Sequence, residues 1–262
     1  MGKREGKVSD PSSTRDVPSG VSVTAVIVDI VKSRVLTADA RRQLQAAVLD
    51  AMARWNRDYG AGILVPFAMT LGDEFEGLLS APEIIPDVMW ELERSAADVR
   101  FRWGIGFGEI HTAVQSAVAA VDGPAFHRAR EAIAEARKES KHGGVYAGFG
   151  DADCLTLNGL SRLLARQRLR FSNEQREAID RLRSGNSQTD AAAQLDVSKQ
   201  ALSQRLKSAG WPAYAEGDAA LRAVLATYNA QKRLGADASL ADATITAASV
   251  RREHASAIVE TR

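Results

Sequence analysis

The sequence predicts an α+β fold, a ferredoxin-like (palm) domain, followed by an all-α domain. As far as Gly150, strand and helix patterns alternate in the order β-α-β-β-α-β-α-β, which is typical of a split βαβ domain. Beyond Gly150 only helical patterns remain, interrupted by Ser, Asn and Gly. The 262 residues, 45% hydrophobic and 26% charged, suffice for one large domain or two ordinary ones and have the composition of a soluble globular protein.

The first half of the expected α+β domain contains three strands and one helix. Residues 21–28 are rich in β-branched and small apolar residues, as in a buried strand, and lead directly to Asp29. Apolar residues spaced three and four apart predict a helix over 38–59. Segments 63–70 and 75–79 flank a Leu-Gly-Asp-Glu turn and are expected to form a hairpin.

The second half adds two helices and two strands. The pattern predicts a helix over 82–97, a strand over 99–110, a helix over 123–141 and a short strand over 145–149. In the ferredoxin-like order, the turn at Asp29 lies beside the tip of the hairpin.

The chain divides into five expected segments. Residues 1–20 form a polar, disordered arm, and 21–150 form the α+β domain. Residues 151–171 form a connecting helix, 172–235 a second domain, and 236–262 an alanine-rich tail that is helical or disordered.

Composition limits the classes of protein that the chain can represent. A single cysteine, Cys154, excludes an internal disulfide and a thiolate cluster for a metal, which fits a reducing compartment. No apolar run approaches the roughly 20 residues that span a bilayer, and no signal-peptide segment begins the chain. We therefore expect a cytoplasmic protein without a membrane partner. The net charge of +1 argues against a uniformly basic coat but allows a local basic patch.

Two acids at the expected turns are the candidate metal ligands. Asp29 ends the first strand, and Asp73 lies in the hairpin turn. Neighbouring carboxylates can hold the divalent cations that nucleotide polyphosphates require. Structural roles remain open as well, because an Asp can cap the following helix and Gly72-Asp73 can close a tight hairpin.

Residues 189–207 have the spacing of a helix-turn-helix. Small Ala192 is expected where two helices cross, Ser198 caps the second helix, and Leu202 and Leu206 anchor its inner face. Six residues at its start or on its outer face are the candidates for DNA binding: Ser198, Lys199, Gln200, Ser203, Gln204 and Lys207. Gln200 and Gln204 suit hydrogen bonding to base edges in a major groove.

Charge supports double-stranded DNA as the partner of this segment, because residues 160–210 hold ten Lys or Arg and five Asp or Glu. A helical bundle with a polar surface, or a helix-turn-helix used for protein contacts, remains the alternative. Arg162, Arg166 and Arg170 recur every four residues and would share one helix face. That face could contact DNA phosphate, grip an anionic ligand or simply be solvated.

Four motifs follow one another in the first domain: Asp29-Ile30-Val31-Lys32-Ser33, Leu71-Gly72-Asp73-Glu74-Phe75, Trp103-Gly104-Ile105-Gly106-Phe107-Gly108-Glu109-Ile110 and Gly123-Pro124-Ala125-Phe126-His127. They resemble the successive motifs of the class III nucleotidyl cyclase catalytic domain, whose fold the diguanylate cyclase (GGDEF) domain shares. Combined with the helix-turn-helix, the chain resembles the SatD family. The cyclase resemblance covers roughly residues 21–150.

By position, the resemblance implies that Asp29 and Asp73 are the two metal-binding aspartates, which would hold Mg²⁺ or Mn²⁺ with a nucleotide. Other positions depart from the cyclases. Met69 replaces the basic residue that recognises the purine, and His127 and Glu131 fall where Asn and Arg orient the ribose and stabilise the transition state. Losing such a cation removes strong stabilisation of the developing charge, so we expect a site that binds rather than catalyses.

Six residues near Asp29, or on the helix expected over 123–141, are the candidates for nucleotide binding: Ser33, Lys32, Arg34, Arg130, Arg137 and Lys141. By resemblance, Arg137 and Lys141 fall near the phosphate-binding Lys and Arg of diguanylate cyclases. Arg130 is next to Glu131, but one residue along a helix is a rotation of about 100°. The helical charges could equally form a solvated face with i,i+4 ion pairs.

These features together predict a DNA-binding transcription regulator whose cyclase-like domain binds a nucleotide and modulates DNA binding. The resemblance allows a nucleoside triphosphate with Mg²⁺ or Mn²⁺, or a cyclic dinucleotide such as cyclic di-GMP, as the ligand. A homodimer is expected, because DNA half-sites are usually bound by symmetric dimers. Two alternatives remain: an active nucleotidyl cyclase localised by its helix-turn-helix, and a constitutive DNA binder whose first domain is a dimerisation scaffold.

Overall fold

A computed structural model describes residues 21–31, 35–70, 73–96, 99–111, 122–138 and 143–230. Two expected segments, the arm over 1–20 and the tail over 236–262, lie outside this described part. Within it, no helix is both long enough and apolar enough to cross a membrane.

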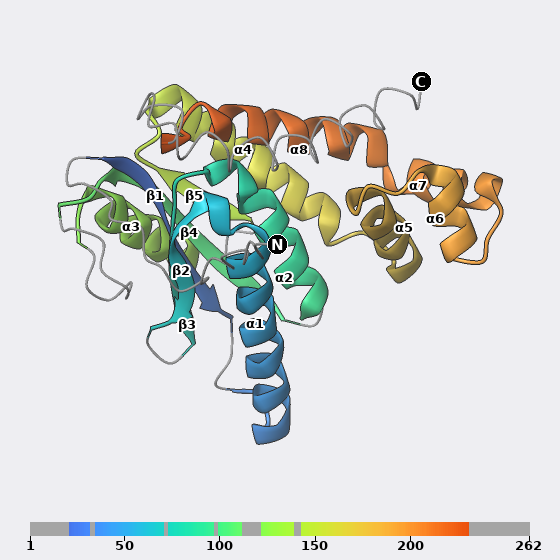
Figure 1. Cartoon of the computed structure of the whole chain (residues 1–262), viewed down its shortest axis with the longest axis horizontal. Helices are drawn as coiled ribbons and strands as arrows, with labels where there is room; N and C mark the ends of the chain where they lie inside the picture. The colour runs from blue at the N-terminus through green and yellow to red at the C-terminus, as the bar shows by residue number, and fades with distance from the viewer. Residues whose placement is uncertain are drawn as a thin grey trace, which may run out of the picture.

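A five-stranded sheet forms the centre of the first domain (Figure 1). Its strands are β1 (Ser22–Ile30), β2 (Ile63–Met69), β3 (Glu74–Leu79), β4 (Phe101–Glu109) and β5 (Gly144–Ala147). The spatial order is β2-β3-β1-β4-β5. The pairs β2–β3, β3–β1 and β1–β4 are antiparallel, and β5 is parallel to β4. This confirms the predicted ferredoxin-like order, with β5 added at one edge.

Three helices cover the two faces of the sheet. α1 (Ala38–Asp58) and α2 (Ile85–Ser95) lie on one face, and α3 (Pro124–Lys138) lies on the other (Figure 1). Two short 3₁₀ helices, η2 (Gly60–Gly62) and η3 (Pro82–Ile84), precede β2 and α2. All strands and helices expected between residues 21 and 150 are therefore present, with bounds that differ by a few residues.

Alternation along β1 decides which face each side chain joins. Val26 and Val28 belong to the large core beneath α1 and α2, whereas Ala25 and Ile27 belong to the core beneath α3. Since successive strand residues point to opposite faces, Asp29 lies on the α3 face of the sheet.

Glycines of β4 allow α3 to approach the sheet closely. A Cβ atom on Gly106 would lie 2.2 Å from both the Ala125 carbonyl oxygen and the Ala129 amide nitrogen. On Gly104 it would lie 2.4 Å from the Ala129 carbonyl oxygen. Alternate glycines in this strand are therefore needed for helix packing, and the close contact fixes α3 above the end of β1.

Beyond Gly150 the described chain is helical, as predicted. The helices are α4 (Asp151–Arg168), α5 (Asn173–Arg183), α6 (Gln188–Gln194), α7 (Lys199–Ala209) and α8 (Trp211–Ala226). Helices α5, α6 and α7 contact one another, and α8 runs back along α4 to reach η3 (Figure 1). The last helix thus connects the α-helical part to the first domain.

Candidate functional site

Asp29 lies at the end of β1 with only 7% of its surface exposed. The sheet register pairs it with Glu74 on β3 and Arg102 on β4. It does not cap the following helix, because the Thr37 hydroxyl caps α1 by accepting a hydrogen bond from the Ala40 amide at 3.2 Å. Asp29 therefore does not have the helix-capping role that the sequence left open.

Two arginines hold the Asp29 carboxylate. Arg102 donates to Asp29 Oδ2 at 2.9 Å, and the Arg137 Nε donates to the same oxygen at 3.4 Å. The Arg137 Nη2 lies 3.3 Å from Asp29 Oδ1 and 2.7 Å from Glu74 Oε2. The hydrogen bond to Asp29 raises the pKa of Arg137, which burial alone would lower, and Glu74 adds to the rise. Arg137 thus acts as a cation shared by two carboxylates.

Asp73, the second predicted metal ligand, lies next to the end of β1. Its carbonyl oxygen accepts a hydrogen bond from the Ile30 amide at 3.2 Å. The hairpin therefore brings Asp29, Asp73 and Glu74 to one edge of the sheet, where carboxylate oxygens suit Mg²⁺ or Mn²⁺. Within the described residues, no three acids, histidines or cysteines form a ready metal cluster. A divalent cation at Asp29 would compete with Arg102 and Arg137 for the carboxylate oxygens, and metal binding there remains a prediction.

The predicted nucleotide-binding residues are only partly described. Lys32, Ser33, Arg34 and Lys141 lie outside the described residues, whereas Arg130 and Arg137 both lie on α3. Arg137 points to the acids, so this part of the helix is more than a solvated face.

The three positions that depart from the cyclases are also described. Met69 is half-buried against the main core. His127 and Glu131 are exposed near the start and middle of α3, and His127 Nε2 lies 3.3 Å from Asp122 Oδ1. None of these three positions therefore carries the Lys, Arg or Asn side chain that the cyclase resemblance would require.

Two residues of this cluster, Arg102 and Glu74, were not predicted from the sequence, which indicated only Asp29 and Asp73 as metal ligands. Arg102 is the first polar residue of β4, and Glu74 directly follows Asp73. Strand alternation could have placed both on the α3 face, but the pairing with Asp29 needed the register between strands.

Glu76 is a buried carboxylate on the same face of β3, with 4% of its surface exposed. Burial raises its pKa above the ordinary value of 4.5, Arg130 opposes the rise, and Glu74 adds to it. An acid whose pKa is raised by folding binds more protons in the folded state, so stability is lost as pH rises above 4.5.

We expect Glu76→Gln to raise the free energy of unfolding at pH 7 and to lose this advantage as the pH falls towards 4.5. Urea unfolding at several pH values measures the difference, and Glu131→Gln, on the exposed face of α3, is the control. A variant that is less stable than the wild type at pH 7 would show that the Glu76 charge is needed.

Helices α6 and α7 have the internal contacts predicted for the helix-turn-helix spacing. Ala192, Leu202 and Leu206 are buried, and the Ser198 hydroxyl caps α7 by accepting from the Ala201 amide at 3.1 Å. Asp196 in the intervening turn has a left-handed backbone, with φ at 51°.

The outer face of α7 is open to solvent. All five side chains expected to contact DNA from this helix are exposed: Lys199, Gln200, Ser203, Gln204 and Lys207. The fold therefore leaves this face of α7 exposed.

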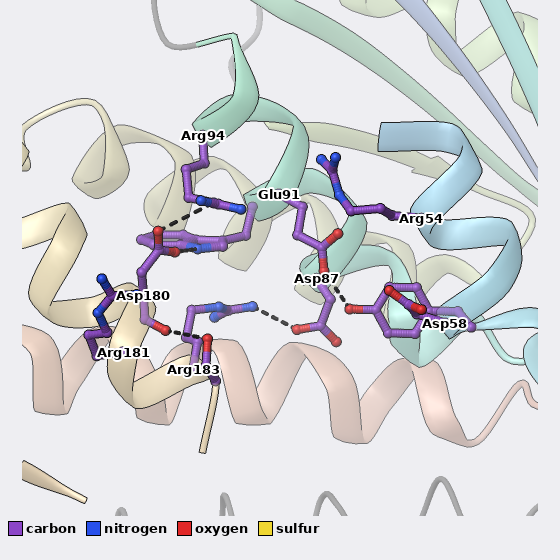
Figure 2. A pocket seen from close by; sticks show the side chains of 11 residues that line it. Arg54, Asp58, Asp87, Glu91, Arg94, Asp180, Arg181 and Arg183 are labelled. Carbon is purple, nitrogen blue, oxygen red and sulfur yellow. Dashed lines mark hydrogen bonds and ion pairs between the residues drawn. The ribbon is translucent and has the colours of Figure 1, made fainter. Parts of the chain in front are cut away.

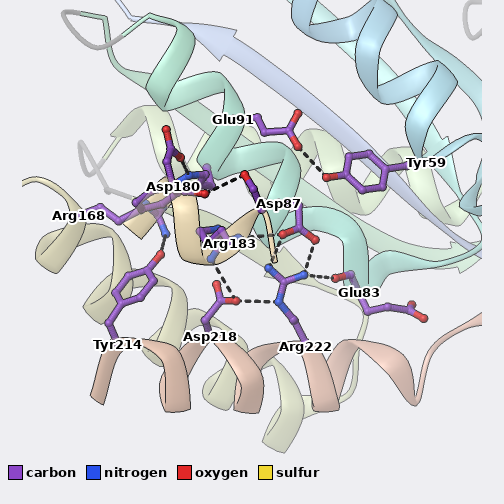
Figure 3. Close-up of polar contacts among 12 residues, drawn as sticks. Tyr59, Glu83, Asp87, Glu91, Arg168, Asp180, Arg183, Tyr214, Asp218 and Arg222 are labelled. Carbon is purple, nitrogen blue, oxygen red and sulfur yellow. Dashed lines mark hydrogen bonds and ion pairs between the residues drawn. The ribbon is translucent and has the colours of Figure 1, made fainter. Parts of the chain in front are cut away.

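A network of ion pairs joins α2 of the first domain to α5 and α8 (Figure 3). The Asp87 carboxylate on α2 accepts from Arg222 of α8 and from Arg183 of α5, each at 2.8 Å. Asp218 of α8 accepts from Arg222 at 2.7 Å and lies 3.5 Å from Arg183. Burial by itself would lower the pKa of Arg222, but Asp87 and Asp218 raise it above the ordinary value.

A second buried pair reinforces this junction. Arg168, at the end of α4, is 4% exposed and donates two hydrogen bonds to the Glu93 carboxylate of α2, at 2.7 and 3.0 Å. It also donates to the Tyr214 hydroxyl of α8 at 3.2 Å (Figure 3). Both ionic groups therefore join α2 to helices that follow Gly150.

A cleft of about 340 Å³ opens at the same junction, between α1, α2 and α5 (Figure 2). Its lining pairs acids with bases: Arg94 lies 3.3 Å from Asp180, and the Tyr59 hydroxyl donates to Glu91 at 2.7 Å. Arg183 lies 4.9 Å above the Trp90 ring. We interpret the cleft as part of the contact between the two parts of the chain.

Strand order and site define an α+β protein with a palm-type sheet, an acid–arginine cluster at one sheet edge and an attached helical region. The profile of the SatD family matches residues 23–224, which include both the sheet and α7. The chain therefore belongs to the SatD family.

Three solved structures illustrate the similarity to known proteins. A bacterial light-regulated adenylyl cyclase is 12% identical, with a TM-score of 0.36, and the match covers 51% of this chain and 44% of that chain. The guanylyl cyclase domain of the RhoGC fusion protein from Blastocladiella emersonii is 23% identical, with a TM-score of 0.28, over 44% and 74% of the two chains. A Regulator of Polyketide Synthase Expression from Bifidobacterium adolescentis is 20% identical, with a TM-score of 0.24, over 81% of each chain.

The chain spans less than half the length of the adenylyl cyclase that it matches. TM-scores of this size carry no argument about function, so the site has to be interpreted from its own residues. A search of the curated proteins gave no match.

Proposed function

We propose that this SatD-family protein is a DNA-binding regulator whose first domain binds a nucleotide and thereby changes the affinity for DNA. The observation that carries the proposal is the exposed polar face of α7. This helix packs on α5 and α8, and ion pairs join α5 and α8 to α2. Helix α2 packs on the sheet whose edge carries Asp29. The sheet, α2 and the helices joined to α2 therefore form a continuous packed connection, through which a structural change at Asp29 can reach α7.

The DNA part of the proposal rests on chemistry suited to a major groove. Gln200 and Gln204 offer amide groups for base edges, and Lys199 and Lys207 offer cations for phosphates. Three helices, α5, α6 and α7, supply the buried base on which this face is presented.

The nucleotide part rests on the cluster at the sheet edge. Asp29, Asp73 and Glu74 are oxygen ligands suited to Mg²⁺ or Mn²⁺, which would neutralise phosphate charge when bound. Arg137 contacts two of these acids, Asp29 and Glu74. When a metal ion takes its place at the acids, its guanidinium group can bind a phosphate of the nucleotide. The candidate ligands are a nucleoside triphosphate with its metal and a cyclic dinucleotide such as cyclic di-GMP.

We expect Gln204→Ala to weaken discrimination between DNA sequences by about 1–3 kcal/mol while leaving non-specific binding almost unchanged. Lys207→Ala should weaken binding to every sequence and reduce the salt dependence of the affinity, because one phosphate contact is lost. Fluorescence anisotropy with a sequence selected from a random pool and with a scrambled control measures both effects. If neither variant changes DNA binding, α7 is not the recognition helix.

The experiment that tests the proposed function is a titration of the purified protein with nucleotides and cyclic dinucleotides, with Mg²⁺ or Mn²⁺, in the presence and absence of DNA. Saturable binding that changes DNA affinity supports a sensor. A nucleotide product that forms with the wild type and is lost in Asp29→Ala supports the active cyclase instead. DNA binding that no nucleotide changes supports the constitutive binder.

A further inference from the structure

The outer face of α4 carries large apolar side chains that the described residues leave uncovered. Leu155 is 77% exposed and Leu163 is 70% exposed, and Leu169, at the end of the helix, is 52% exposed. The opposite face of α4 is buried through Leu157 and Leu164. Three of the five exposed large hydrophobic residues in the described part of the chain thus belong to this one helix or its end, which indicates an interaction surface.

Gly159 lies midway between Leu155 and Leu163 on this exposed face. A Cβ atom added there would meet nothing within 4 Å, so no close packing within the described chain requires a glycine. Glycine in a helix interior is unfavourable compared with alanine. A glycine between two exposed leucines suits the close approach of another helix backbone.

The spacing about Gly159 is symmetric, since one leucine precedes it by one helical turn and the other follows it by one turn. A two-fold axis through Gly159 would therefore place Leu155 of one copy against Leu163 of the other, twice.

Charge complementarity supports the same antiparallel arrangement. Asp151 is exposed in the first turn of α4, and Arg166 is exposed near its last turn. With the axis at Gly159, Asp151 of one copy lies opposite Gln167 of the other, next to the long side chain of Arg166. Antiparallel helices also place their opposite dipole ends side by side.

We propose that α4 is a homodimer interface, in which the α4 helices of two copies pack antiparallel and cross at Gly159. The proposal does not depend on DNA or nucleotide binding.

If the proposed function holds as well, the α4 contact also determines where the two α7 helices lie. Each α7 is fixed to the C-terminal end of its own α4, where the Gln167 amide donates to the Ala209 carbonyl at 2.9 Å. The two α7 helices then lie on opposite sides of the axis, as reading two half-sites requires.

Disulfide cross-linking at the axis tests the geometry. In a Cys154→Ala background, Gly159→Cys places two thiols across the axis, where the helices approach closely enough for a disulfide. Mild oxidation should convert most of this protein to a covalent dimer. Ala193→Cys, exposed on α6, is the matched control and should stay monomeric on a denaturing gel. Equal cross-linking of both variants, or of neither, would overturn the proposal.

Sedimentation equilibrium of the full chain tests the surface without any cysteine. The wild type should be dimeric, Leu163→Glu should weaken association at least tenfold, and Leu49→Glu, which changes an exposed leucine on α1, should leave it unchanged. Arg166→Glu and Asp151→Arg should each weaken association and, combined, restore it. A monomeric wild type, equal loss in Leu49→Glu, or no rescue in the charge-swapped double variant would contradict the interface. If removal of residues 231–262 restores dimerisation to a monomeric wild type, that segment is the occupant instead.

Discussion

Replacing Asp87 by alanine is expected to destabilise the protein by about 3–5 kcal/mol, because the change leaves buried arginines without their main carboxylate. Asp87 accepts hydrogen bonds from both Arg222 and Arg183. The side chains of these arginines are 23% and 12% exposed, so water can replace the lost carboxylate only in part. The loss should be greatest at the junction between α2, α5 and α8.

Urea unfolding followed by circular dichroism measures this effect. Asp39→Ala is the matched control, because Asp39 pairs with Arg42 on the surface of α1, where both side chains are more than two-thirds exposed. Such a pair contributes roughly 0–1 kcal/mol. Similar losses in the two variants would mean that the buried network does not hold the two parts of the chain together.

Replacing Asp29 by alanine should weaken nucleotide binding by roughly 100-fold or more. Asp29 is the buried acid that Arg102 and Arg137 contact, and it is one of the two predicted metal ligands. Its removal takes away one ligand of the proposed metal and the Asp29 contacts of Arg137. Losing a charged partner in such a site typically costs several kcal/mol.

Isothermal titration calorimetry with nucleotides and Mg²⁺ or Mn²⁺ measures the Asp29→Ala effect, and circular dichroism confirms that the variant is folded. Asp50→Ala, an exposed acid on α1, is the control and should bind as the wild type does. Unchanged nucleotide affinity in Asp29→Ala would show that the nucleotide does not bind at Asp29.

Much of the fold could be predicted because it follows from local patterns. The β-branched run before Asp29 and the three-four spacing from 38 to 59 determine β1 and α1 almost alone. The return of α8 to the first domain could not be predicted, because it depends on Asp87 and Arg222, which are 135 residues apart. Long-range pairs of this kind leave no periodic signal in the sequence.

The candidate site was only partly predictable for a related reason. Motif positions identified Asp29 and Asp73, but they could not show that arginines satisfy Asp29. Arg102 became visible only when the β1–β4 register was known. In the helical region, by contrast, the capping role of Ser198 and the burial of Leu202 were predicted correctly, since both depend on residues close in sequence.

The most direct test of the central claim is the DNA affinity of the nucleotide-saturated protein compared with that of the nucleotide-free protein. Fluorescence anisotropy at fixed salt, with a selected DNA sequence, should give dissociation constants that differ by about tenfold or more, which corresponds to roughly 1.4 kcal/mol of coupling. The difference should vanish in Asp29→Ala while the nucleotide-free affinity stays the same. Equal affinities of the saturated and the free wild type would contradict the account.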